Sequence, residues 1–248
     1  MRVLVCIDDT DNIDSKGTGA LATMLAQTIE ERGWGKSSGI TRHQLLVHPD
    51  IPYTSHNSSM CFQAEIDGGY LDTLINYASE FLALESAEGS DPGLCVALPD
   101  QISKPELLIA FGHQAKETVV TKQHAYSLAK ELGIHLSEHG GTGQGVIGAL
   151  AGAGLRLSGN DGRFKGKIKI KTEHDVITVK DICARANIDL VKSLEGTILG
   201  AEDLIRLGET VKTVLLEGKA VLLVFPTGKK EPGEPLWQTC TKQQLKAF

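Results

Sequence analysis

The chain has 248 residues, of which 41% are hydrophobic, so it can bury one sizeable core or two modest ones. No apolar run approaches the roughly 20 residues that span a bilayer, and the N-terminus lacks the basic-then-apolar layout of a signal peptide. These properties argue against a membrane or disordered protein and predict a soluble, globular, cytoplasmic one.

The formal charge of -6 is spread unevenly along the sequence. Residues 1–160 contain 10 Lys and Arg against 19 Asp and Glu, whereas residues 161–248 contain 15 against 12. The first part is therefore expected to be a poor nonspecific binder of nucleic acid, and only the second could present a mildly basic face. Nucleic acid is disfavoured as a partner on charge alone, though not excluded.

In chain order, strands and helices alternate over the first 160 residues. The expected elements are a strand at 3–7, a helix at 20–32, strands at 41–47 and 59–66, a helix at 70–84, strands at 94–98 and 107–111, a helix at 114–132, an extended piece at 134–136 and a small-residue helix that follows a glycine-rich loop. This order predicts an α+β (α/β-like) domain over residues 1–160, with helices packed on a mixed sheet.

The character of the sequence changes after residue 160. Lys165, Lys167, Lys169 and Lys171 alternate with smaller residues, which is the pattern of a half-exposed strand. Further expected elements are a strand at 176–179, a helical turn at 180–186, a hairpin formed by 213–216 and 220–225, and an irregular tail after Pro226. Residues 161–248 are therefore predicted to form a small β-rich accessory domain.

Cysteine and histidine give little sign of a metal centre. The five cysteines are far apart and form no CxxC pair, so buried free thiols are expected. The histidines are interpreted as loop hydrogen-bonders rather than zinc ligands. His139 is the exception, because it precedes a glycine-rich loop, and it is a candidate catalytic residue.

Asp8, Asp9 and Asp11 directly follow the first strand, which is apolar and β-branched enough to be buried on both faces. Clustered carboxylates at the end of such a strand can hold Mg²⁺, which needs only one or two of them beside water and phosphate. An aspartate-rich turn that caps backbone amides is the alternative interpretation.

Lys16, Gly17, Thr18 and Gly19 come next and resemble part of a phosphate cradle, although they do not match the P-loop spacing. Backbone amides at the start of the following helix could face an anion, and Lys16 would add positive charge. A helix start capped by Thr18 explains the segment equally well.

A second glycine-rich element runs from His139 as HGGTGQGVIGALAGAG. Dense loop glycines let a backbone approach a ligand closely, so the loop of Gly141, Thr142, Gly143, Gln144 and Gly145 is predicted to bind a diphosphate. The later glycines, Gly148, Gly152 and Gly154, are assigned mainly to close helix packing. If both elements serve one site, the two stretches must meet in space although some 130 residues separate them.

IDDTD near the N-terminus, HPDIPY and GTGQGVIGALAGAGLRL together resemble the archaeal agmatinylcytidine synthetases, which modify the wobble cytidine of an isoleucine tRNA. The resemblance covers residues 1–160 and implies an ATP-using, kinase-like fold. It also implies magnesium and nucleotide contacts for Asp8, Asp9 and Asp11, a phosphate-contacting or phosphate-accepting hydroxyl at Thr18, and nucleotide binding by Gly141–Gly145.

The chain also departs from that family. It has PYTSHNS where the family carries a basic loop resembling PYKTRGN, and it has no cysteine-rich zinc ribbon. We therefore do not extend tRNA modification to this chain. The sequence predicts an Mg²⁺-dependent ATP-binding protein with a kinase-like phosphotransfer or ATP-driven synthetase site, whose acceptor is an unknown small molecule or RNA. A noncatalytic nucleotide- or small-ligand-binding module and a tRNA-binding protein are the alternatives, and the sequence leaves the oligomeric state open.

Overall fold

The fold was examined in a computed structural model, which describes residues 1–51, 57–228 and 235–248. The chain forms two compact units, Met1–Ser158 and Gly159–Phe248.

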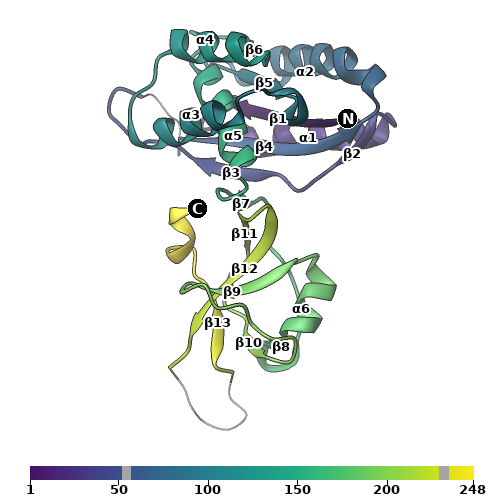
Figure 1. Ribbon diagram of the computed structural model, residues 1–248, viewed down its shortest axis with the longest axis vertical. Coiled ribbons are helices and arrows are strands. Elements are labelled where there is room, and N and C mark those ends of the chain that lie inside the picture. Colours follow the sequence, from purple (N-terminus) through teal and green to yellow (C-terminus); the bar gives the residue numbers. More distant parts are fainter. Residues whose placement is uncertain (52–56, 229–234) are drawn as a thin grey trace. The chain divides into compact units, whose positions relative to one another are not determined.

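Unit 1 is built on a sheet whose strand order is β6-β5-β1-β4-β3, with β2 also paired to β4 (Figure 1). The strands are β1 (Arg2–Asp8), β2 (Gly35–Ser37), β3 (Thr41–Gln44), β4 (Ser58–Ile66), β5 (Gly93–Ala97) and β6 (His135–Glu138). The pairings among these strands are antiparallel. β1 lies between β4 and β5, so it is covered on both edges.

Helices cover both faces of this sheet. Successive side chains of β1 point to opposite faces, so they pack with different helices. Val3, Val5 and Ile7 pack with α1 (Thr18–Glu31) and α2 (Leu71–Glu85). Leu4 and Cys6 pack with α3 (Pro105–Glu117), α4 (Lys122–Leu132) and α5 (Gly145–Ser158). The expectation of a first strand buried on both faces is confirmed.

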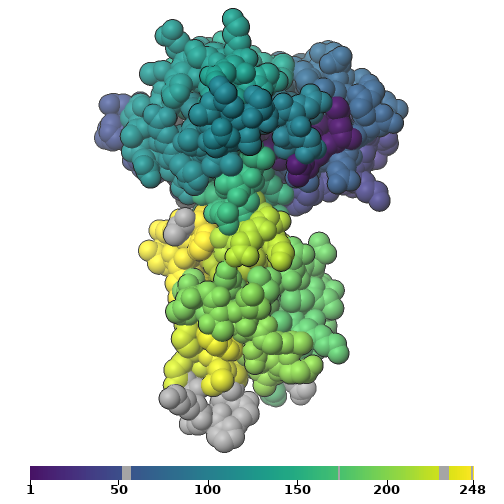
Figure 2. All heavy atoms as spheres, viewed as in Figure 1, coloured from purple at the N-terminus to yellow at the C-terminus, as the bar shows by residue number. Residues whose placement is uncertain are grey.

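In the space-filling view, α3 and α4 form much of the visible face of unit 1, and the N-terminal residues show only in a small purple area (Figure 2). Two short 3₁₀ helices, η1 (Gly68–Tyr70) and η2 (Pro99–Gln101), complete the regular structure of the unit. The strand that leads to the predicted site, β1, is buried from Val3 to Ile7.

One predicted strand of unit 1 is wrong. Residues 107–111 belong to α3, and the predicted helix at 114–132 is two helices, α3 and α4. A short apolar run fits a strand or a helix, and here Leu108, Phe111 and Ala115 are buried at helical spacing. α3 ends at Glu117, and Thr121 caps α4 by accepting a hydrogen bond from the His124 amide. The strand β2 was not predicted.

α5 is the most buried helix of unit 1, and its small residues make that possible. A side chain at Gly154 would place its Cβ 2.1 Å from the carbonyl oxygen of Leu108 in α3. At Gly152 the Cβ would lie 2.6 Å from the Cys6 sulfur on β1. The prediction that the C-terminal glycines serve close packing is therefore confirmed for these two positions.

Unit 2 is β-rich, with a second set of paired strands and one α-helix, α6 (Val179–Ala186). Its strands are β7 (Arg163–Phe164), β8 (Val176–Thr178), β9 (Leu190–Ser193), β10 (Leu204–Arg206), β11 (Thr213–Leu216), β12 (Lys219–Pro226) and β13 (Trp237–Thr239). The order is β7-β11-β12-β13-β10-β8, and β9 pairs with β12. The β10–β13 and β9–β12 pairs are parallel, whereas the predicted β11–β12 hairpin is antiparallel. Short 3₁₀ helices lie at η3 (Glu173–Asp175) and η4 (Gln244–Ala247).

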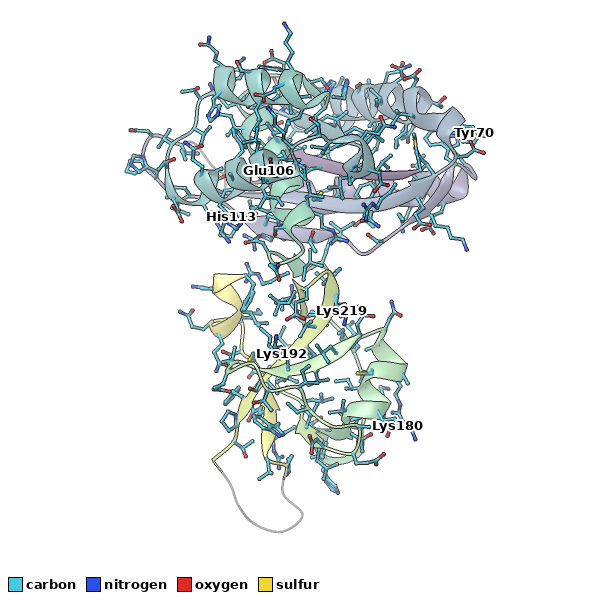
Figure 3. All side chains as sticks on the ribbon, viewed as in Figure 1. Tyr70, Glu106, His113, Lys180, Lys192 and Lys219 are labelled. Atoms are coloured by element: carbon cyan, nitrogen blue, oxygen red, sulfur yellow. The ribbon has the colours of Figure 1, made fainter. Side chains whose placement is uncertain are left out.

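The predicted lysine strand of unit 2 does not form. Between Lys165 and Lys171 the only bridge among the described residues is Ile168 to Val211. The alternation still has a structural cause, because Ile168 and Ile170 pack against the core of the unit while the four lysines are exposed. The tail after Pro226 is less irregular than predicted, since it contains β13. Other lysines of the unit come from different elements, namely Lys180 on α6, Lys192 on β9 and Lys219 on β12 (Figure 3).

The predicted fold class is confirmed: the described residues form a mixed α+β protein with mostly antiparallel strand pairs. All five cysteines are free, and all but Cys183 are buried. In the described part of the chain, no helix combines the length and the apolar character that crossing a bilayer requires.

Candidate functional site

The carboxyl end of β1 opens into a cavity of about 360 Å³. It is lined by Asp8, Asp9, Asp11, Thr18, Leu45, Asp50, Ile51, Asn57, Ser58, Ala115, Thr118, Val119, Val120, Gln144, Gly145, Ile147 and Gly148. The aspartates that follow the first strand and the start of α5 therefore lie in one cavity, although they are far apart in the sequence.

Asp8 reaches this cavity through space that Gly148 leaves open. The Asp8 side chain is only 8% exposed, and a Cβ on Gly148 would come within 1.6 Å of its Oδ2 atom. Any larger residue at position 148 would displace the carboxyl group. Gly148, which the sequence assigned mainly to helix packing, thus makes room for a site residue.

The surroundings of Asp8 and Asp9 disfavour the charged form of their carboxyl groups. Burial, with the nearby charge of Asp9, raises the pKa of Asp8 to about 8. Burial, with the charges of Asp91 and Asp11, raises the pKa of Asp9 to about 6. Because a cation beside these groups would reverse both effects, the cluster has the chemistry of a cation site.

Thr18 is the first residue of α1, and its hydroxyl faces the aspartates. Its Oγ1 donates to Asp11 Oδ1 at 2.8 Å and accepts from Thr10 Oγ1 at 3.1 Å. The capping position belongs to Gly17, with φ at +79°, and no side chain caps the helix. The alternative that Thr18 is the helix cap is therefore wrong, and its hydroxyl is 6% exposed next to a potential proton acceptor.

The lining of the cavity combines acidic and apolar side chains. Its charged lining residues are all aspartates, and no Lys or Arg among the described residues lines it. Six apolar residues also line it: Leu45, Ile51, Ala115, Val119, Val120 and Ile147. A ligand of this cavity should therefore carry an apolar or aromatic part and bring positive charge with it.

The glycine loop only partly faces the cavity. Gln144 and Gly145 line it, whereas Gly141, Thr142 and Gly143 do not. Thr142 instead donates from its backbone N to Asp91 Oδ1 at 2.6 Å. Asp91 was not predicted as a site residue from the sequence.

Four other predicted site residues do not line the cavity: Lys16, Gly17, Gly19 and His139. Lys16 is exposed. The Nε2 atom of His139 lies 2.8 Å from Ser137 Oγ, which is also 3.0 Å from His135 Nε2. His135 and Ser137 lie on β6 and His139 directly follows it, so these alternate residues point to the same side of the extended chain, and both imidazoles contact Ser137.

No group of three or more His, Cys, Asp and Glu side chains is arranged to hold a metal ion within the described ranges 1–51, 57–228 and 235–248. Magnesium needs fewer protein ligands than that, since water and phosphate complete its octahedron. The carboxylates present fit such a site in number and kind.

Comparisons with known proteins point to one enzyme, the isoleucine-tRNA 2-agmatinylcytidine synthetase TiaS. Residues covering 63% of the chain are 32% identical to TiaS of Archaeoglobus fulgidus and 26% identical to TiaS of Methanosarcina acetivorans. The chain is a distant homologue of TiaS. It spans 36% of the length of these two relatives. No protein-family model matches the chain.

Solved structures of TiaS agree. The complex of TiaS with its isoleucine tRNA and ATP superposes with a TM-score of 0.53 at 28% identity, over 62% of this chain and 36% of that one. The apo form of TiaS gives a TM-score of 0.52 at 28% identity, over 62% and 35%. The resemblance noted in the sequence is thus confirmed as distant homology to part of an ATP-dependent enzyme. The loop PYTSHNS, at residues 52–58, lacks the family's basic residues. Positions 52–56 of this loop lie outside the described residues.

Proposed function

We propose that this chain is an Mg²⁺-dependent ATP-binding protein with a kinase-like phosphotransfer or ATP-driven synthetase site. The observation that carries the proposal is the cavity that gathers Asp8, Asp9, Asp11 and Thr18 beside the start of α5. The relative whose structure contains ATP supports the nucleotide. The acidic lining supports a nucleotide that arrives with a divalent cation.

In this proposal each site residue has a separate role. Asp8, Asp9 and Asp11 would hold Mg²⁺, which supplies charge neutralisation to the phosphate oxygens. The apolar residues that line the cavity would accept the nucleotide base. The Thr18 hydroxyl would contact the terminal phosphate of ATP, or accept it as the γ-phosphorus separates from the leaving ADP; in that case the hydroxyl proton would pass to Asp11 across the 2.8 Å hydrogen bond.

Substituting single aspartates tests the metal and nucleotide assignment. Asp9→Asn and Asp11→Asn should each weaken Mg²⁺·ATP binding by about tenfold or more, because each removes a candidate metal ligand. Asp14→Asn is the matched control: this residue lies in the same loop, is exposed and does not line the cavity. Titration calorimetry of the three variants measures the effect. Equal affinities for all three would refute the assignment.

Turnover separates an enzyme from a noncatalytic binding module. The hydrogen-bonded pair of Thr18 and Asp11 favours the enzyme, because a binding site alone needs no proton acceptor at a hydroxyl. Pure protein should hydrolyse or transfer the terminal phosphate of ATP, and the activity should be lost in Asp11→Asn. Binding of ATP without turnover in the presence of any amine or RNA acceptor would favour the binding module.

A further inference from the structure

Asp91 connects the two halves of the candidate site. Its backbone forms a hydrogen bond to Asp9, and its carbonyl oxygen accepts from the amide of Gly145 at 3.1 Å. The residue therefore touches the aspartate cluster on one side and the first residue of α5 on the other.

The Asp91 carboxylate occupies the amides of the glycine loop. Oδ1 accepts from the Thr142 amide at 2.6 Å, and Oδ2 accepts from the Gln144 amide at 3.4 Å. The Thr142 hydroxyl also donates to Oδ2. Amides at a helix start are the groups that bind phosphate in many proteins, and here a carboxylate of the same chain is bound to them.

The loop glycines are explained by this contact. A Cβ on Gly141 would lie 1.7 Å from Asp91 Oδ1, and one on Gly143 would lie 1.4 Å from Glu138 Oε2. Both residues also have positive φ, +55° and +75°. The glycine density that suggested a diphosphate loop therefore accommodates two acidic side chains of the protein.

Glu138 provides a comparison on the other side of the loop. It pairs with Lys122 at 2.9 Å, and Lys122 donates to the Thr142 carbonyl oxygen at 2.8 Å. Glu138 thus supports the loop through Lys122, whereas Asp91 binds the loop's amides directly. Of these two acids, Asp91 is the one whose carboxylate is bound to amides that an anion could use.

We infer that Asp91 is the internal anion of the glycine loop and a determinant of specificity: it keeps uncomplexed phosphate from the amides of Thr142 and Gln144. Two anions cannot share the same donors, and free triphosphate would also meet the aspartates of the cavity. Phosphate ligands are accepted only as complexes with a divalent cation. This inference rests on the proposed function, because it assumes that the cavity binds a nucleotide.

The test is titration calorimetry with inorganic triphosphate in EDTA, using wild type, Asp91→Asn and the matched control Glu138→Gln. Asp91→Asn keeps the shape of the side chain but removes the charge, so it should bind metal-free triphosphate at least about tenfold more tightly than wild type. Glu138→Gln should bind it as weakly as wild type. Equal or weaker binding by Asp91→Asn, or an equal gain in both variants, overturns the inference.

Two further measurements keep the outcomes separate. In ¹⁵N NMR spectra of the wild type, the amides of Thr142 and Gln144 should not shift when triphosphate is added in EDTA, and a shift overturns the inference even if the variants fail to fold. Binding of Mg²⁺·ATP to the wild type tests the proposed function alone. A gain in Asp91→Asn without Mg²⁺·ATP binding by the wild type would refute the proposed nucleotide and with it the specificity role of Asp91, and would support only the exclusion of phosphate from the loop amides.

Discussion

Asp8 places a carboxyl group where water has little access. It ends β1, lies against Gly148 and has two further carboxylates nearby. An isolated negative charge in such a place is costly, so the metal-free protein keeps this group protonated near neutral pH. The residue is therefore a point where ligand binding and folding stability are linked.

The pH dependence of stability follows from the raised pKa of Asp8. In the unfolded chain the carboxyl group ionises near pH 4, whereas in the fold it stays protonated up to about pH 8. The protonated form favours the fold, so this contribution is fully present below pH 4 and is lost as the pH rises to 8. Without metal, wild-type stability should fall across this window.

Asp8→Asn removes that dependence. Because one pKa unit corresponds to about 1.4 kcal/mol, the variant should be more stable than wild type by about 2 kcal/mol or more at pH 8 in EDTA, and similar to it at pH 4. Urea unfolding at the two pH values measures the difference. Excess Mg²⁺ should stabilise wild type more than the variant, which keeps Asp9 and Asp11, and a variant less stable than wild type at pH 8 in EDTA would contradict the assignment.

At the scale of residues, the sequence predicts candidate site residues that stand close together in the chain. Asp8, Asp9 and Asp11 were predicted because clustered carboxylates after a buried strand are visible within a few positions, and Thr18 because it begins the helix that follows; the four line one cavity. Asp91 was not predicted, because its partners lie 51 and 53 residues further on and a lone aspartate before Pro92 is ordinary turn chemistry.

At the scale of elements, α5 holds the site together. It packs against β1 through Gly148 and Gly152 and against α3 through Gly154. Small residues let the helix axis approach its neighbours closely, which brings the loop before α5 next to the end of β1. The geometry of the cavity therefore depends on residues that do not line it.

Gly154→Ala tests this packing. In an open helix, alanine in place of glycine stabilises by about 1 kcal/mol. Here the added Cβ would lie 2.1 Å from the Leu108 carbonyl oxygen, so we expect destabilisation by about 2 kcal/mol or more. Gly68→Ala is the control, since the nearest atom to its Cβ would be 3.9 Å away. Thermal unfolding of both variants measures the effect, and equal melting temperatures would argue against a tight α3–α5 crossing.

Elements with a clear period were predictable and short apolar runs were not. The α2 helix was predicted to within a residue or two because its apolar residues repeat over four turns. Residues 107–111 were predicted as a strand because five apolar or small residues fit either structure. The lysine segment at 165–171 has the period of a strand but lacks a partner except at Ile168, and strand pairing is not visible in a local pattern.

At the scale of the whole molecule, the cavity and the exposed lysines belong to different units. Each hydrophobic cluster of the described residues also lies within one unit: two in unit 1 and two in unit 2. All the described residues that line the cavity fall between Asp8 and Gly148. The homology to TiaS in these matches covers less than two thirds of the chain.

Cutting the chain between the units tests this division of labour. Because unit 1 contains its own core and all the described residues that line the cavity, residues 1–158 should unfold cooperatively and bind Mg²⁺·ATP within about threefold of the full chain.

Association with RNA, if it occurs, should depend on Lys165, Lys167, Lys169 and Lys171 and should weaken steeply with salt. Removing unit 2, or changing these four lysines to glutamine, should then abolish it while ATP binding persists. Calorimetry with ATP and filter binding of labelled tRNA at two salt concentrations measure both properties. Loss of ATP binding from a folded 1–158 fragment would show that unit 2 contributes to the site.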